Sequence, residues 1–150
     1  MALSELLERD EISHAFVDMD VLRHACPAPP GDPFNIRLGM RNLASIWANY
    51  RAAGIERLIL ADIVEDPSQA ADYCVAIPGA SVTIVRLTAP ASVIARRLSG
   101  RETGDTLAWY IDRAAYLSAL MDKLGVGEET VDTANVTATE AAVIIRPRIL

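Results

Sequence analysis

Lysine is almost absent from this sequence, in which Lys123 is the only lysine among 14 basic residues. The 20 acidic residues outnumber the basic ones and give a net charge of -6 at pH 7. Nucleic acids and anionic membrane surfaces are bound through clustered cations that neutralise phosphates. The charge balance therefore predicts no nucleic-acid partner and no membrane partner, although a local basic site remains compatible with it.

Cysteines and long apolar runs are scarce as well. Cys26 and Cys74 form no CxxC pair, and a secreted disulfide scaffold of this size usually carries more cysteines, so both are expected as small buried or half-buried thiols. No apolar run approaches the roughly 20 residues that a membrane-spanning helix needs. The acidic, amphipathic start MALSELLERDE does not resemble a signal peptide. These features predict a cytoplasmic protein.

The sequence is rich in hydrophobic residues, which make up 51% of its 150 positions. That length is enough for one domain with a buried core, so a single domain over residues 1–150 is predicted. Apolar spacing predicts strands at residues 15–17, 58–60, 81–87 and 129–132. It predicts helices at residues 2–9, 36–50, 67–77, 91–98, 106–124 and 138–146. Trp47, Tyr50 and Trp109 sit at helical spacing and are expected in the core.

The ends of these elements carry recognisable signals. Residues 27–33 are rich in proline and predict a loop. Thr137 and Glu140 fit a capping box at the start of the last helix, and Pro147 is expected to end it. His14 and His24 show no metal-ligand spacing and are interpreted as core or surface residues.

Alternating strands and helices predict an α/β fold with a mostly parallel sheet, whose ligand sites lie at the carboxyl ends of strands. Asp18 and Asp20 follow the first strand, and Asp62 follows the second. Carboxylates in such places can hold Mg²⁺ through water, accept a hydrogen bond from a substrate hydroxyl, or take its proton. The structural alternative is that Asp20 caps the next helix while Asp18 is solvated.

Several segments, taken in order, resemble the small-molecule kinase branch of the P-loop proteins. They are FVDMD, the Pro-rich loop, NIRLGMRNLASIWANYRAAG, RLILAD and TIVRLTAPASVIARRLSGRETGD. The relatives in question are adenylylsulfate-kinase-like, gluconate-kinase-like and chloramphenicol-phosphotransferase-like proteins. The resemblance covers nearly the whole chain from Ala2 and rests on the order of elements. It implies a three-layer, mostly parallel sheet and an ATP-dependent phosphotransferase that acts on a small polar molecule.

The resemblance also implies roles for individual residues. Asp18 and Asp20 would be the catalytic carboxylates, with Asp20 and Asp62 associated with Mg²⁺. Arginines near the Pro-rich loop would bind the acceptor substrate, namely Arg23, Arg37 and Arg41. Arginines of a lid would close on the nucleotide phosphates, namely Arg96, Arg97 and Arg101. Ordinary surface charge is the structural alternative for each arginine.

The first element of that family, a strand leading into GxxxxGK[ST], is absent from the sequence. The loop's backbone N–H groups cradle the phosphates and its lysine reaches them. Here Lys123 lies in MDKLGVG, the first glycine is Gly31, and ALSELLER matches the rest of the helix after the loop. We therefore expect the first, central strand and the loop to be missing, through a start assigned too late or a fragment rather than true loss.

This gap makes the use of ATP and Mg²⁺ doubtful and predicts no ATP turnover by residues 1–150. It also predicts a vacant strand position between the strands at Leu58 and Ile84, through which copies of the chain could associate. The alternative function is a non-catalytic ligand-binding or regulatory α/β module. A doubly wound domain outside the P-loop group is a further alternative, which the strand order would distinguish.

Overall fold

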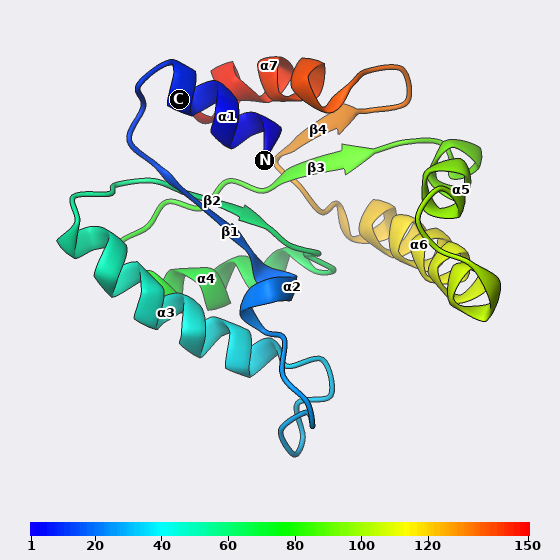
Figure 1. Ribbon diagram of the computed structural model, residues 1–150, viewed down its shortest axis with the longest axis horizontal. Helices are drawn as coiled ribbons and strands as arrows, with labels where there is room; N and C mark the ends of the chain where they lie inside the picture. The colour runs from blue at the N-terminus through cyan, green and yellow to red at the C-terminus, as the bar shows by residue number, and fades with distance from the viewer. The chain divides into compact units, whose positions relative to one another are not determined.

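The computed structural model describes residues 1–150, along which strands and helices alternate (Figure 1). Four strands are present: β1 (Ala15–Asp18), β2 (Leu58–Ala61), β3 (Val85–Thr88) and β4 (Glu129–Asp132). Seven α-helices are present: α1 (Ala2–Arg9), α2 (Met19–Leu22), α3 (Ile36–Ala52), α4 (Ala70–Ala76), α5 (Ala91–Ser99), α6 (Gly104–Leu124) and α7 (Ala138–Ile149). The predicted α/β class is confirmed. No helix has both the length and the apolar character required to cross a membrane.

The chain divides into two compact units. The first contains Met1–Ile63 and Ser68–Val82, and the second contains Val64–Pro67 and Thr83–Leu150. Each unit holds one parallel strand pair, β1 with β2 and β3 with β4, and no hydrogen-bonded ladder joins β2 to β3. The parallel pairing is confirmed, and the strands form two small two-stranded sheets. The three-layer sheet that the resemblance implies stays a prediction.

In the first unit, β1 alternates between buried and more exposed positions, as expected for a strand with one face toward a core. Leu7, Met19 and Leu43 are fully buried there, with exposed fractions of 1%, 1% and 0%. α3 packs against α2 and α4. A Cβ atom at Gly39 would lie 3.0 Å from Cβ of Arg23, so a glycine on α3 allows the close approach that positions Arg23.

In the second unit, α5 packs against α6 and α7 packs against β4. Arg86 of β3 links the sheet to α6, because its Nη2 lies 2.8 Å from Oδ1 of Asp122 and donates to the carbonyl of Ser118 at 3.2 Å. Gly127 passes this side chain with a φ of 99°. Thr137 and Glu140 form the predicted capping box at the start of α7, which is confirmed.

Several boundaries differ from the sequence-based expectations. β3 begins only at Val85, and the segment at Pro67–Gln69 is a 3₁₀ helix that precedes α4. Pro147 does not end α7, which continues to Ile149. Proline removes its own N–H bond to the previous turn, but near a helix end this loss does not stop the next residues from remaining helical.

Three burial predictions were wrong. Cys26 and Cys74 are both exposed, the former in a loop and the latter on α4. Trp109 is 56% exposed on α6, where its ring meets the edge of Tyr110 at a centroid distance of 5.0 Å. Helical spacing among apolar residues was the reason for expecting it in the core. α6 carries apolar side chains around much of its surface, so spacing alone does not identify the buried face.

Candidate functional site

The carboxyl end of β1 runs directly into α2, and Asp18 lies at the junction. Oδ1 of Asp18 accepts a hydrogen bond from the backbone N–H of Asp20 at 3.0 Å and so caps α2. The structural alternative considered for the sequence placed a cap here, but at Asp20. Asp18 takes this position instead because α2 begins at Met19, two residues earlier than expected. The Asp18 side chain is exposed and held in one place.

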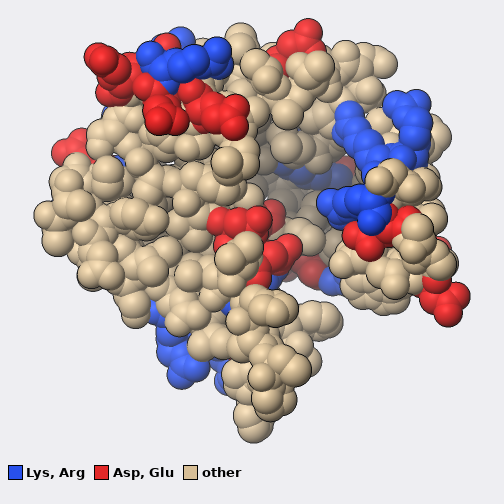
Figure 2. All heavy atoms as spheres, in the orientation of Figure 1, with Lys and Arg blue, Asp and Glu red and all other residues tan.

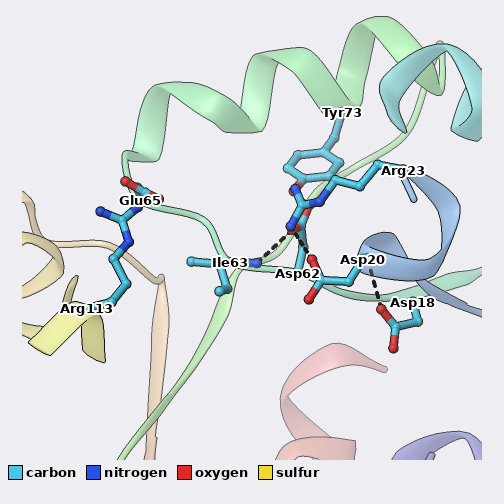
Figure 3. Close-up of polar contacts among 8 residues, drawn as sticks. All are labelled: Asp18, Asp20, Arg23, Asp62, Ile63, Glu65, Tyr73 and Arg113. Atoms are coloured by element: carbon cyan, nitrogen blue, oxygen red, sulfur yellow. Dashed lines mark hydrogen bonds and ion pairs between the residues drawn. The ribbon is translucent and has the colours of Figure 1, made fainter. Parts of the chain in front are cut away.

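Arg23 connects the carboxylates that follow the two strands of the first unit (Figure 3). Its Nη2 forms an ion pair with Asp20 and lies 3.2 Å from Oδ1 of Asp62. The Asp62 carboxylate also accepts hydrogen bonds from the hydroxyl of Tyr73 at 2.6 Å and from the N–H of Ile63 at 2.8 Å. Three internal donors therefore satisfy Asp62.

Burial separates the members of this cluster, which we call the Asp62 cluster and define as Asp20, Arg23, Asp62 and Tyr73. The side chains of Arg23 and Asp62 are only 15% and 6% exposed, whereas that of Asp20 is 72% exposed. Burial by itself would lower the pKa of Arg23, but the hydrogen bond to Asp20 and the charge of Asp62 raise it overall. Burial raises the pKa of Tyr73, and its hydrogen bond to Asp62 adds to the rise. Arg23 is thus held as a cation and Tyr73 as a hydrogen-bond donor.

The guanidinium of Arg23 lies where Mg²⁺ was expected to meet Asp20 and Asp62. No group of three or more histidine, cysteine, aspartate or glutamate side chains is arranged to hold a metal ion. Figure 2 shows acidic side chains gathered on the first unit around the ends of β1 and β2. Binding of Mg²⁺ by these carboxylates stays a prediction, and it would require Arg23 to move.

Two of the three predicted acceptor-binding arginines share a shallow depression of about 400 Å³. The residues that line it are Pro29, Pro30, Asp32, Arg37 and Arg41. Arg37 donates to the carbonyl of Gly31 at 2.9 Å, which ties it to the Pro-rich loop. Arg41 lies one turn further along α3 and is exposed. Arg23 does not line this depression and belongs to the Asp62 cluster instead.

Asp32 is a buried acid that was not predicted from the sequence. Only 6% exposed, it accepts a hydrogen bond from the N–H of Leu38 at 3.1 Å. Burial alone would raise its pKa, but the N–H groups in the first turn of α3 and the charge of Arg37 lower it. An Asp-Pro pair before a helix was the available signal for this role. Tyr73, the other missed residue, offered no local signal.

The predicted lid arginines lie in the second unit, where Figure 2 shows basic side chains gathered over α5. Arg97 is held by Thr133 after β4, since its Nη1 donates to Oγ1 at 3.0 Å and its Nη2 donates to the carbonyl oxygen. Arg101 lies over the ring of Tyr110, and its Nε is 3.5 Å from Glu102. Arg96 is exposed on α5. Their nucleotide contacts stay predictions.

A scan against protein-family models found no match for this chain, and a search of curated proteins found no relative.

Proposed function

We propose that this chain is a P-loop-kinase-like α/β domain whose first unit binds a small acceptor carrying a hydroxyl group and an anionic group. The observation that carries the proposal is the position of Asp18. It is an exposed carboxylate, fixed by its cap on α2, at the carboxyl end of a parallel strand pair. Ligand sites in parallel α/β folds form at such strand ends.

The pairing of strands supports the fold behind this proposal. In the resembled family another strand separates the strands that correspond to β2 and β3. The resemblance therefore predicts parallel pairs β1–β2 and β3–β4 without a ladder between β2 and β3, and this is the observed pairing. A doubly wound sheet with β2 beside β3 would have a different order.

The two halves of the acceptor would use different residues of the first unit. One oxygen of Asp18 is used by the helix cap, which leaves the other to accept a hydrogen bond from the acceptor hydroxyl or to take its proton. Arg37 and Arg41 supply positive charge beside the Pro-rich loop, and a guanidinium pairs well with a carboxylate, sulfate or phosphate. These two features are the reason for proposing an acceptor that carries both a hydroxyl group and an anionic group.

The sequence contains no GxxxxGK[ST] element, so the backbone cradle for ATP phosphates is lacking. Binding of the acceptor without phosphate transfer is therefore expected of residues 1–150. One observation favours a non-catalytic ligand-binding module as the second candidate. Asp62 is fully engaged by Arg23, Tyr73 and Ile63, which leaves it unable to serve Mg²⁺ in this conformation.

Isothermal titration calorimetry with three probes tests the proposal: gluconate, adenylyl sulfate and chloramphenicol. We expect one of the two anionic probes to bind and the neutral chloramphenicol to bind at least tenfold more weakly. Arg41→Gln and Asp18→Asn should each weaken that binding about tenfold or more, as expected for the loss of a charge-assisted hydrogen bond. Asp112→Asn, which removes an exposed carboxylate on α6, is the matched control and should have no effect.

Two results would contradict the proposal. One is that neither anionic probe binds, or that binding is unchanged in both Arg41→Gln and Asp18→Asn. The other concerns only the expected absence of turnover, which transfer of radiolabelled γ-phosphate from ATP to any of the three probes by residues 1–150 would contradict. A probe could instead bind more weakly to Arg41→Gln and unchanged to Asp18→Asn. The non-catalytic module would then be the better description, because Asp18 would make no contact with the hydroxyl group of the acceptor.

A further inference from the structure

A second constellation of reactive side chains lies at the opposite end of β1 from Asp18. Ser4, on the first turn of α1, has its Oγ 2.7 Å from Nε2 of His14, the residue just before β1. Nδ1 of His14 lies 2.7 Å from the carbonyl oxygen of Ile12. The Asp62 cluster contains none of these residues, so this site is separate from the one described above.

The hydrogen bonds fix the tautomer of a neutral His14 ring. A carbonyl oxygen can only accept, so Nδ1 of His14 must carry the hydrogen that faces Ile12. In the neutral ring Nε2 then has no hydrogen and must accept one from the Ser4 hydroxyl. A serine that donates to a histidine whose other nitrogen is held by a third group is the arrangement that activates a serine nucleophile.

Ser4 and His14 both line an open depression of about 460 Å³, large enough for a small molecule. Its rim includes Glu11, whose φ of 54° puts a non-glycine residue in the left-handed region. Such backbone conformations are uncommon and gather at functional sites. Glu8 also lines the depression, so its charge favours neutral or cationic ligands over anions.

We propose that Ser4 and His14 form a nucleophilic dyad that hydrolyses small, uncharged or cationic carboxylic esters. Oγ of Ser4 attacks the ester carbonyl carbon while its proton passes to Nε2 of His14. The bond to the alcohol oxygen then breaks, and the alcohol leaves with that proton. Water next attacks the acyl-serine and gives a proton to Nε2. The carboxylic acid departs as that proton returns to Ser4.

Labelling with a fluorophosphonate probe tests the dyad, because the probe bonds covalently to the oxygen of activated serines and releases fluoride. Peptide mapping by mass spectrometry of the labelled wild-type chain should place the label on Ser4. Ser4→Ala should abolish labelling, and His14→Gln should slow it about 100-fold, the usual effect of losing a general base. Ser13→Ala is the matched control, since Ser13 lines the same depression without bonding to His14, and it should label at the wild-type rate.

Hydrolysis of p-nitrophenyl acetate provides a second readout, which Ser4→Ala should reduce to the buffer rate. The proposal is overturned if Ser4 of the folded wild-type chain takes up no label, or if His14→Gln labels at the wild-type rate. Circular dichroism establishes that each variant is folded. Because the label is mapped on the wild-type chain, the dyad can be tested even if a variant fails to fold. Either result leaves the acceptor-binding proposal unaffected.

Discussion

Nη2 of Arg23 lies 3.2 Å from Oδ1 of Asp62, and both side chains are largely shielded from water. The pair joins the residue after α2 to the residue after β2, two segments that are far apart in the sequence. A buried ion pair does not always add stability, because both charges lose their hydration. Removing one partner is nevertheless costly, because the other charge then stays buried without compensation.

Asp62→Asn should therefore lower the free energy of unfolding by about 2–4 kcal/mol, near the usual cost of breaking a buried pair. Tyr73→Phe removes only one hydrogen bond to the same carboxylate and should cost about 1 kcal/mol. Urea denaturation followed by circular dichroism measures both values. A smaller loss for Asp62→Asn than for Tyr73→Phe would contradict the view that Asp62 balances the charge of Arg23.

Arg23→Gln should make the carboxylates of Asp20 and Asp62 available to a cation. Without the guanidinium, Asp20 and Asp62 remain near each other with no compensating positive charge, and carboxylate oxygens are the ligands that Mg²⁺ prefers. The variant should bind Mg²⁺ at least tenfold more tightly than the wild type in isothermal titration calorimetry. Arg51→Gln, on the exposed part of α3, is the control and should not change binding. Equal binding by wild type and Arg23→Gln would show that Arg23 does not compete with the metal.

Gly127→Ala should be among the most destabilising single changes in the second unit. A Cβ at this position would lie 2.8 Å from Cβ of Arg86 and 3.0 Å from the carbonyl oxygen of Glu129, in a backbone conformation with a φ of 99°. A cost of about 3 kcal/mol is expected from the steric overlap and the strained conformation combined.

Gly125→Ala is the matched control for that change, since Gly125 also has a positive φ of 64°, but a Cβ added there would meet no neighbouring atom within 4 Å. It should cost only about 1 kcal/mol, the strain of a left-handed residue. Thermal or urea unfolding gives both differences. If the two glycines tolerate alanine equally well, the close contact with Arg86 is not a constraint.

The capping box of α7 predicts a dependence of stability on pH. Hydrogen bonds from the N–H and hydroxyl of Thr137 lower the pKa of Glu140 in the folded chain. A carboxylate with a lowered folded pKa contributes stability above its unfolded pKa and loses it as pH falls through the folded value. Glu140→Gln should therefore lower the free energy of unfolding near neutral pH, and this destabilisation should become smaller as the pH falls. The variant should lose less stability than the wild type on going to low pH. Unfolding curves of both proteins between pH 3 and 7 measure this difference in stability. That range of about four units includes the usual carboxylate pKa. An effect of the same size at both ends of that range would contradict the mechanism.

Much of the local structure followed from patterns a few residues long. The apolar runs that became β1, β2 and β4, the amphipathic spacing of α3, and the Thr137–Glu140 capping box are short-range signals, because neighbouring residues of a helix or strand meet each other in any fold. The alternation of these elements was enough for the α/β class and for parallel pairing.

Other features depended on contacts between distant segments. Spacing in the sequence does not predict that Arg23, after α2, contacts Asp62, after β2. Nor does it predict that Tyr73 on α4 donates to the same carboxylate. The positions of these residues depend on how whole elements pack. The same holds for Ser4 and His14, two ordinary residues until α1 folds back beside the start of β1. Residue type and spacing were sufficient to predict the carboxylates at the strand ends as candidate site residues. Only packing decided that an arginine, held by burial and charge, would lie between two of them.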